Sequence, residues 1–386
     1  MKLGTGFLLA SMVVGVTAQH LEASAGRTPQ PGWDIVKAAQ YLDDRMELWF
    51  SKATQLQTDQ GKTACVSCHT VVPYVLARPA LRRAMGVSNP TPQEVKLLDE
   101  TLRRVATYAS HQPLYANKDQ PSRGTEAVLN ALILAHQDAV QQRPQPSEPT
   151  RQAFNELWER QRPDGAWDWL DAALEPYESK DATFYGATLA ALAIGTAPGI
   201  APDPQEINGS HVRRLRLYLK EKYRDQNLYN RVWLLLAASR LTGLLTPAQR
   251  EALMGEMQEK QHDDGGWSLY QLGPWRWSGV PPPDGPRGKV DVQLLTRSDG
   301  YATGLMAYTL RQAGLPPGHP ALQRAKDWLQ TNQRECLINQ QLWKCWRTYS
   351  LNNDQEHGGE HGEPWPRMFM SDAATAFAAL ALLSLE

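Results

Sequence analysis

Five consecutive residues, Cys65-Val66-Ser67-Cys68-His69, have side-chain types and a spacing that could carry out chemistry. They match the C-x-x-C-H pattern of covalent haem attachment. Two thiols about one helical turn apart can add to the two vinyl groups of one porphyrin, and the adjacent histidine then lies under the iron as its proximal ligand. The pattern predicts one covalent haem c bound through Cys65, Cys68 and His69. A disulfide between the two cysteines and a zinc site are the alternatives.

The ligand on the other side of the iron stays open. Met85 and His111 follow the motif at separations from which either could reach it, and His262, His357 and His361 lie in loops that we expect at the same end of the fold. A methionine ligand suits electron transfer, whereas an empty position suits ligand binding or oxidation. Residues 357–361 also have the composition of a metal-binding loop, for which a solvated connection is the alternative.

The first 18 residues have the pattern of an export signal. Lys2 precedes an apolar stretch from Phe7 to Val16, and Thr17-Ala18 offers the small residues that signal peptidase requires. This stretch is shorter than the roughly 20 residues that span a bilayer, and no later stretch is apolar enough to do so. We therefore expect a signal peptide at 1–18, a flexible segment at 19–33 and a periplasmic or secreted mature protein without a transmembrane segment.

The two remaining cysteines, Cys336 and Cys345, would lie in an oxidising compartment after export. We predict a disulfide between them, with two buried free thiols as the alternative. The charge is nearly balanced, with 40 Lys and Arg against 41 Asp and Glu. Because phosphate contacts need a basic excess, this balance argues against a nucleic-acid partner.

Six pairs of helical stretches must position these residues. In each pair an amphipathic stretch is followed by a loop and then by a stretch that is apolar on nearly all faces. Polar-faced helices outside and apolar helices inside satisfy both patterns, and few alternating runs predict strands. We expect one all-α domain at 34–386, a six-hairpin α/α toroid of inner and outer helices. The expected pairs are 34–54 with 67–85, 91–110 with 125–136, 151–161 with 182–194, 212–222 with 228–242, 247–261 with 302–313, and 321–331 with 373–385.

Two loops carry a repeated motif. The segments 160–167 and 260–267 share a glutamine, an Asp-Gly pair and a tryptophan in the order Gln…Asp-Gly-x-Trp. This motif resembles the repeats of terpenoid cyclases of the squalene-hopene cyclase type and of protein prenyltransferases. The resemblance implies a six-hairpin α/α toroid over about residues 34–386, in which Gln ends an outer helix, Gly allows the turn and Trp packs the loop.

In such a toroid the junctions between the loops and the inner helices meet at one end of the ring. His69 lies at one junction, and Asp181, Asp299 and Asp372 lie at others. These three aspartates are candidate pocket residues beside the haem. The alternative is that each one caps the helix that follows it, because Asp is a preferred N-cap residue.

The residues for ordinary cyclase or prenyltransferase activity are missing. The inner stretches contain no Asp-x-Asp-Asp acid motif and no Asp, Cys and His set for zinc. The first hypothesis is therefore an exported haem protein for electron transfer or redox chemistry, which would need a redox partner protein. Whether it is an enzyme is left open.

Two other hypotheses follow from the loops and the cavity. A haem-dependent oxidoreductase would hold an apolar, isoprenoid-like ligand inside the ring, against the loop residues Trp167, Trp169, Trp267, Trp275, Trp277 and Trp365. A carbohydrate-active toroid enzyme would need two carboxylates that flank a sugar cleft. The candidates for those carboxylates are Asp164, Asp168 and Asp264.

Overall fold

The computed structural model describes residues 32–200, 207–275, 292–352 and 368–386. The expected signal peptide at 1–18 and the segment 357–361 lie outside these ranges. No helix within them is both long enough and apolar enough to cross a membrane.

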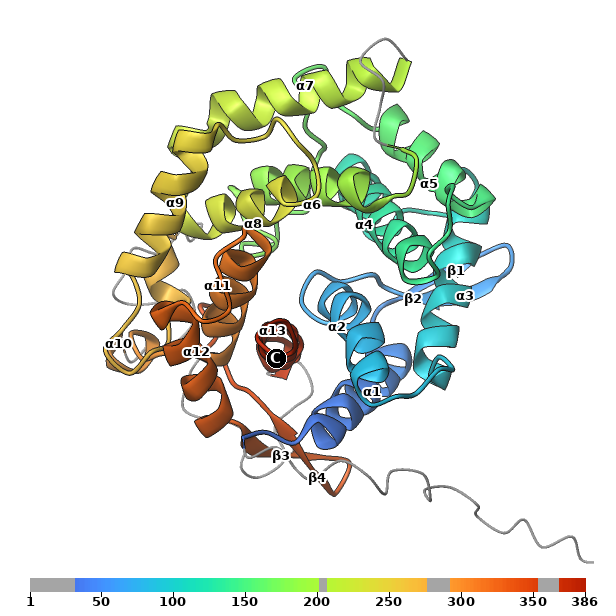
Figure 1. Ribbon diagram of the computed structural model, residues 1–386. Coiled ribbons are helices and arrows are strands. Elements are labelled where there is room, and N and C mark those ends of the chain that lie inside the picture. The colour runs from blue at the N-terminus through green and yellow to red at the C-terminus, as the bar shows by residue number, and fades with distance from the viewer. Residues whose placement is uncertain (1–31, 201–206, 276–291, 353–367) are drawn as a thin grey trace, which may run out of the picture.

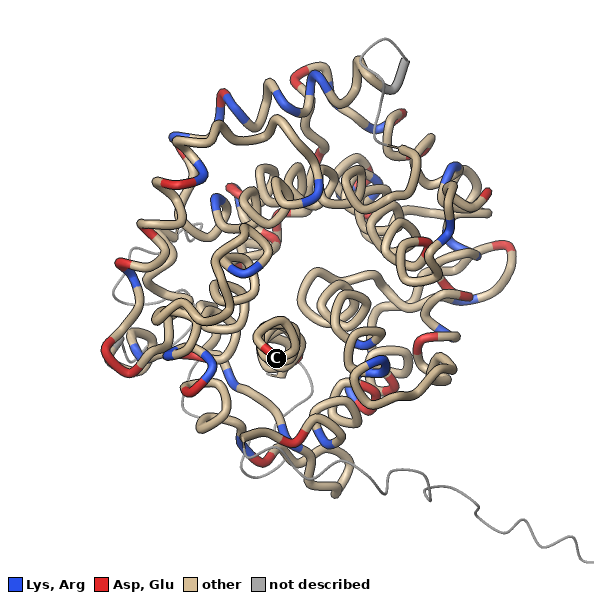
Figure 2. The backbone as a smooth tube through the Cα atoms, in the orientation of Figure 1, with Lys and Arg blue, Asp and Glu red and all other residues tan. Residues whose placement is uncertain are grey.

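An outer layer of six helices surrounds the molecule (Figure 1). Each outer helix buries one face and leaves the other in solvent, as α3 does with Leu97 and Val105 buried and Val95 exposed. Figure 2 shows that the charged residues lie mainly on this outer layer. The outer helices are α1 (Ile35–Lys52), α3 (Pro92–Ala106), α5 (Glu148–Glu159), α7 (Ile207–Lys222), α9 (Pro247–Glu259) and α12 (Pro320–Thr331).

An inner ring of six helices alternates with the outer helices along the chain. The inner helices are apolar on most faces, because they are covered on every side, and α6 and α13 are buried along almost their whole length. Consecutive inner helices contact one another, and α13 also contacts α2, so that the ring closes. The inner helices are α2 (Val71–Ala84), α4 (Asp119–Val140), α6 (Ala182–Thr196), α8 (Leu228–Ala238), α11 (Gly300–Gln312) and α13 (Phe369–Ser384).

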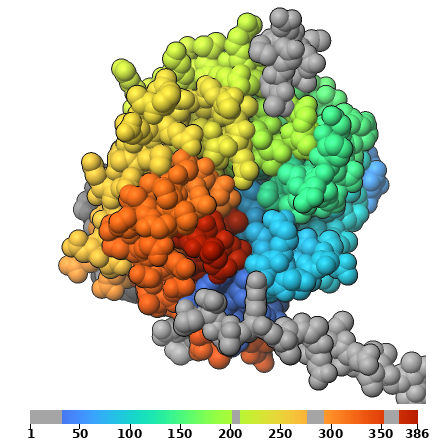
Figure 3. Space-filling model, viewed as in Figure 1, coloured from blue at the N-terminus to red at the C-terminus, as the bar shows by residue number. Residues whose placement is uncertain are grey.

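This arrangement confirms the predicted all-α, six-hairpin α/α toroid. Each expected pair of stretches corresponds to one outer and one inner helix. In the space-filling view the C-terminal helix α13 lies in the middle of the face, between α11 and α12 on one side and α2 on the other (Figure 3). The helices therefore form a closed ring and not an open solenoid.

Two short β-hairpins were not expected from the sequence. Strands β1 (Gln55–Thr58) and β2 (Gly61–Ala64) pair antiparallel, and so do β3 (Arg334–Ile338) and β4 (Gln341–Cys345). In the second hairpin, Asn339 and Gln340 form the turn with positive φ angles of 49° and 68°. A short helix α10 (Val292–Leu295) and three 3-10 turns complete the described elements.

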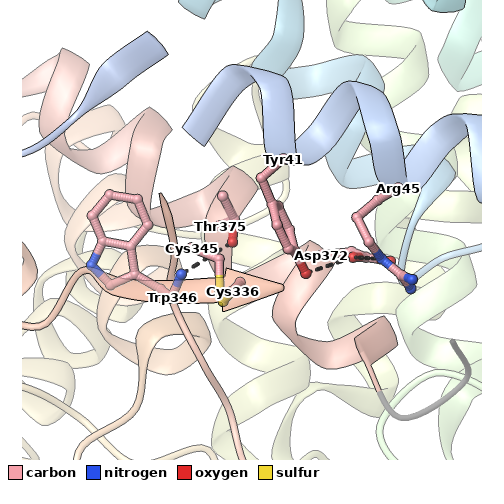
Figure 4. Close-up of a disulfide and its surroundings, with 7 residues drawn as sticks. All are labelled: Tyr41, Arg45, Cys336, Cys345, Trp346, Asp372 and Thr375. Carbon is pink, nitrogen blue, oxygen red and sulfur yellow. Dashed lines mark hydrogen bonds and ion pairs between the residues drawn. A yellow bond between two sulfur atoms is a disulfide. The ribbon is translucent and has the colours of Figure 1, made fainter. Parts of the chain in front are cut away.

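The predicted disulfide is present between Cys336 on β3 and Cys345 on β4. Both cysteines are buried against the core, and the hairpin packs on α1 and α13. Beside the disulfide, the backbone N–H of Trp346 donates to Thr375 on α13 at 3.1 Å (Figure 4). The disulfide therefore stiffens a hairpin that lies over the junction between the first and the last helices.

The Gln…Asp-Gly-x-Trp segments form the same turn twice. Trp167 Nε1 donates to the carbonyl of Leu157, and Trp267 Nε1 donates to that of Met257, each at 2.7 Å. The tryptophan thereby satisfies a carbonyl in the last turn of the outer helix, where no intrahelical donor exists. Trp346 makes the same kind of bond: its Nε1 donates to the carbonyl of Leu329 on the outer helix α12, at 2.8 Å.

The glutamine of each segment joins neighbouring repeats. Gln161 Nε2 donates to the carbonyls of Gly165 and of His211 on α7, both at 3.0 Å. Gln261 Nε2 donates in the same way to Gly265 and to Ala321 on α12, both at 2.8 Å. The motif therefore has a structural role, because it fixes each turn to the outer helix of the next unit.

The ring is closed by a buried ion pair between the first and the last helices. Arg45 on α1 binds Asp372 on α13 through Nε at 2.6 Å and Nη2 at 3.0 Å (Figure 4). Tyr41 donates to the same carboxylate at 3.0 Å, and Thr70, next to α2, donates to it at 2.7 Å. The relative exposures of Arg45 and Asp372 are 2% and 1%. One carboxylate of the last helix is thus joined to the first helix and to the start of the second.

Replacing Asp372 by Asn should destabilise the ring strongly. The change leaves the Arg45 guanidinium buried without a counter-charge, so we expect the free energy of unfolding to fall by about 3 to 5 kcal/mol. Urea unfolding followed by circular dichroism measures the change. The control is Asp99→Asn, because Asp99 forms an exposed i,i+4 pair with Arg103 and its loss should cost about 0.5 kcal/mol or less. Equal effects of the two substitutions would contradict this account of ring closure.

Candidate functional site

The N-terminal ends of the inner helices lie at one end of the ring. Every inner helix follows an outer helix, so the six inner helices run in the same direction. Most connections at this end are long, including 53–70, 160–181 and 260–299, whereas those at the other end, such as 85–91 and 313–319, are short. Since long loops carry most binding and catalytic residues, the long-loop end is the candidate site.

The sequence-predicted residues His69, Asp181, Asp299 and Asp372 all lie at the long-loop end. His69 directly precedes the cap of α2, Asp181 and Asp299 occupy the N-cap positions of α6 and α11, and Asp372 lies in the first turn of α13. The equivalence of the repeats, which the sequence implied, therefore places these side chains at one end of the molecule.

Asp299 and Asp372 are engaged inside the protein. Asp299 caps α11 by accepting from the N–H of Ala302 at 2.9 Å, and it also accepts from the N–H of Leu269 at 2.6 Å and from Thr348 Oγ1 at 2.8 Å. Burial raises its pKa to about 6, although these hydrogen bonds oppose the shift. Asp372 closes the ring as described above. Both carboxylates therefore hold the fold, whereas Asp181 is half-buried at the start of α6.

His69 is surrounded by aromatic rings. Phe369, at the start of α13, is stacked on it with centroids 4.1 Å apart and planes at 15°, and Trp49 presents an edge at 5.2 Å. Tyr177 lies 6.2 Å away on the loop before α6. Burial, assisted by the charge of Arg45, lowers the pKa of His69 to about 3. The imidazole is therefore neutral at any physiological pH.

Cys65 and Cys68 are free thiols in this structure. Burial raises the pKa of Cys65 to about 12 and raises that of Cys68 well above its usual value. Cys65 Sγ donates to the carbonyl of Val66 at 3.3 Å, and Trp49 Nε1 donates to the carbonyl of Cys65 at 2.6 Å. Both thiols are therefore protonated, and these two hydrogen bonds to backbone carbonyls hold the segment that begins at Cys65.

Sequence reasoning missed a tyrosine cluster and one glutamate. Tyr185, Tyr229 and Tyr301 extend from the first turns of α6, α8 and α11, and the hydroxyls of Tyr229 and Tyr301 are 2.9 Å apart. Tyr177 packs against all three at centroid distances of 5.8 to 6.4 Å. The signal was a tyrosine near the start of three inner helices whose stretches are otherwise mostly apolar.

Glu178 is the missed glutamate. It follows Tyr177 and is half-buried, and burial raises its pKa above the usual value against the opposing charge of Lys118. Its carboxylate has no side-chain hydrogen bond within the described ranges. The charge of Glu178 also raises the pKa of both Cys65 and Cys68, so that the carboxylate faces the same region as the thiols. A carboxyl group in this setting can act as an acid, because its protonated form persists to higher pH.

The candidate carboxylates in the repeat loops have different surroundings. Asp164 and Asp264 are exposed, and each accepts from the backbone N–H two residues later, at 3.1 and 3.0 Å. Among the described residues, the Asp168 carboxylate is held by Arg162 alone, at 3.5 Å. The neighbouring residue Trp169 donates through Nε1 to the carbonyl of Tyr177 at 2.8 Å. The loop segments that carry Asp168 and Glu178 therefore lie side by side.

The residues proposed as the sixth ligand lie apart from His69 or are already bonded. Met85 follows the last turn of α2, and a helix of 14 residues separates it from His69 by about 21 Å. His111 is bound at Nδ1 by Thr107 and at Nε2 by Glu126. His262 is likewise bound at both ring nitrogens, by Ser298 and Gln271. His357 and His361 lie outside the described residues.

Comparison with known proteins shows the fold alone. No protein-family model matches the chain, and no curated protein sequence matches it. The chain is similar in structure to an alpha-1,6-mannanase of Salegentibacter sp. HEL1_6, solved as an inactive variant with two adjacent aspartates replaced by alanine, in complex with alpha-1,6-mannotetrose. The TM-score is 0.51 at 14% identity, over 92% of this chain and 100% of the mannanase. The toroid that the sequence resemblance implied is thus present, whereas no comparison supports a terpenoid cyclase.

The haem prediction is overturned by two findings. A solved structure that shares this fold is an alpha-1,6-mannanase, and the described residues contain no group of three or more His, Cys, Asp or Glu that could hold a metal ion. In the described structure Cys65 and Cys68 are free thiols, and the rings of Phe369 and Trp49 pack against the His69 ring at centroid distances of 4.1 and 5.2 Å. The predictions of haem c at Cys65, Cys68 and His69, of iron binding and of electron transfer are wrong. The expected redox partner and the haem-dependent oxidoreductase lose their basis with them.

The buried Asp299 carboxyl should make stability depend on pH. Its pKa of about 6 in the folded protein exceeds the usual aspartate value of 3.8, so between these pH values the folded state holds a proton that the unfolded state has lost. The contribution of Asp299 to the free energy of unfolding is fully present below pH 3.8. It falls by about 3 kcal/mol as the pH rises through 6. Urea unfolding of the wild type and of Asp299→Asn at pH 4 and pH 7 tests this. The wild type should lose stability relative to the variant between these pH values, and a constant difference would contradict the shift.

Proposed function

We propose that this protein is a glycan-hydrolysing enzyme and that its active site lies at the long-loop end of the toroid. The supporting observation is Glu178, a half-buried carboxyl with a raised pKa and no side-chain hydrogen bond, beside aromatic rings. The mannanase with a similar fold binds an oligosaccharide, which supports an α-linked glycan as the substrate class. The carbohydrate-active hypothesis from the sequence therefore becomes the leading one.

In the proposed reaction Glu178 is the proton donor. Its protonated carboxyl gives a proton to the glycosidic oxygen as the bond from that oxygen to the anomeric carbon breaks, and water supplies the oxygen that replaces it on that carbon. Desolvation favours the protonated form and raises the pKa of Glu178, and the nearby Lys118 opposes this shift, because its positive charge stabilises the anion. The group can then be protonated before the reaction and ionised after it.

Asp168 is the second carboxylate of the proposal. Hydrolysis of a glycoside needs two carboxylates roughly 5 to 10 Å apart, one as acid and one as base or nucleophile. Asp168 lies on the same loop as Glu178, on a segment joined to the Tyr177 backbone by Trp169. It is partly exposed and lies 3.5 Å from Arg162. Its surroundings thus differ from those of Glu178, whose burial raises its pKa.

The aromatic side chains give the site its sugar-binding character. Tyr177, Trp49 and Phe369 gather around His69 at the same end of the ring. Flat aromatic faces pack against the apolar faces of sugar rings, while polar groups between them bind the hydroxyls.

The disulfide between Cys336 and Cys345 supports the periplasmic or secreted location proposed from the sequence.

The variant Glu178→Gln tests the proposed acid. With a panel of α-linked oligosaccharides that includes alpha-1,6-mannotetrose, and with released reducing ends quantified by chromatography, kcat should fall by about 100-fold or more. The same change should remove the alkaline limb of the pH profile, which the wild type should show above the usual glutamate pKa. Asp168→Asn should lower kcat by a comparable factor.

The matched control is Glu148→Gln, because Glu148 is an exposed carboxylate on α5 that pairs with Arg151 of the same helix. It should retain wild-type kcat and pH dependence. The proposal fails if the wild type cleaves none of the glycans, or if Glu178→Gln is as active as Glu148→Gln.

A further inference from the structure

A chain of hydrogen bonds leads from the ring-closing ion pair to His69. Asp372 is fixed by Arg45 and Tyr41, and Thr70 Oγ1 donates to its Oδ2 at 2.7 Å. Thr70 Oγ1 also lies 2.9 Å from His69 Nδ1. The chain therefore runs from a buried carboxylate, through one hydroxyl, to one nitrogen of an imidazole.

Counting protons along this chain fixes the histidine tautomer. A threonine hydroxyl has one proton, and Thr70 gives it to Oδ2 of Asp372, whose two oxygens also accept from Arg45. The hydroxyl oxygen can then only accept from His69, so Nδ1 carries the imidazole proton. Because the imidazole is neutral, it has no second proton, and Nε2 presents a lone pair.

The lone pair of Nε2 has no partner in the described protein. No hydrogen bond to Nε2 occurs among these residues, and the atom is not sealed in the core, since His69 is only half-buried. The ring cannot turn freely, because Phe369 covers one face and Trp49 contacts it edge-on. Nε2 is thus a fixed acceptor on a ring whose centroid lies 6.2 Å from that of Tyr177, the residue that precedes Glu178.

We infer that His69 binds a hydroxyl group of the glycan through Nε2, and that Thr70 and Asp372 are positioning residues that hold Nε2 free of a proton. The inference rests on the proposed function, and it assigns to His69 a part in selecting the glycan substrate. A sugar hydroxyl is a suitable ligand because it can donate to Nε2, whereas a ketone or an ether has no proton to give. A site with such an acceptor rejects sugars that lack the hydroxyl, because the acceptor then stays unpaired.

Nitrogen-15 NMR of the labelled wild type tests the tautomer without any substrate. His69 should show a protonated Nδ1 and an unprotonated Nε2 at neutral pH, assigned by comparison with His69→Phe. In Thr70→Val the hydroxyl is lost, so Nδ1 loses its acceptor and the spectrum should shift toward the Nε2–H form. A wild-type His69 with its proton on Nε2 would overturn the inference, whatever the enzyme activity.

The chain offers a matched control for the threonine substitution. Thr107 Oγ1 donates to the carbonyl of Arg103 at 2.8 Å and lies 3.1 Å from Nδ1 of His111, so it is a second threonine paired with a histidine. Thr107→Val should alter the His111 resonances and leave those of His69 and the activity unchanged. Thr70→Ser keeps the hydroxyl and should restore the His69 spectrum.

Kinetics on the glycan that the wild type cleaves test the role in binding. Thr70→Val should lower kcat/KM by about tenfold, the loss expected for one uncharged hydrogen bond, and His69→Phe by at least as much. The alkaline limb that belongs to Glu178 should stay in place in both variants. Unchanged kcat/KM in both, with the predicted tautomer present, would overturn the binding role of His69 and leave the role of Glu178 standing. If no glycan is cleaved or bound, both proposals fail, and the NMR result alone then describes the histidine.

Discussion

A closed ring of helices needs an interaction that joins its first and last members, and here a buried ion pair supplies it. Arg45 on α1 and Asp372 on α13 are separated by almost the whole chain, yet they form a two-pronged contact with nearly no exposure. Removing two charges from water is expensive, so such a pair is stable only when further hydrogen bonds satisfy its remaining atoms. Tyr41 and Thr70 make those bonds. Because Thr70 adjoins α2, ring closure also sets the position of the segment that carries His69.

The other repeats are joined by weaker, recurring contacts. Gln161 and Gln261 connect each turn to the next outer helix, and Trp167 and Trp267 satisfy carbonyls where outer helices end. Gly165 and Gly265 have φ angles of +97° and +92°, and a Cβ at either position would collide with a carbonyl of the adjacent outer helix. These turns therefore explain the motif without any catalytic role. They also leave the rest of each long loop free to carry residues such as Asp168 and Glu178.

The pKa values of two titratable groups at this end of the ring are shifted in the directions that favour the neutral forms. Burial raises the pKa of Glu178 and lowers that of His69, because desolvation disfavours charge on either group. A neutral acid and a neutral hydrogen-bond acceptor beside aromatic rings suit an uncharged, hydroxyl-rich ligand better than an ionic one. The electrostatics and the mannanase-like fold therefore support the same class of substrate.

Apolar periodicity alone predicted the two helical layers and the six pairs, because a helix without a polar face must be covered on all sides. It also placed His69, Asp181, Asp299 and Asp372 at one end, since repeats of equal direction bring equivalent junctions together. The tertiary structure decided what these residues do. The Cys65-x-x-Cys68-His69 spacing predicted a haem from local sequence, whereas the partners of His69, namely Thr70, Phe369 and Tyr177, come mostly from distant parts of the chain. Glu178 had no local signal, because its raised pKa results from burial by segments that meet only in the folded ring. Local sequence determines which groups are available, and long-range packing determines their neighbours, on which their protonation and reactivity depend.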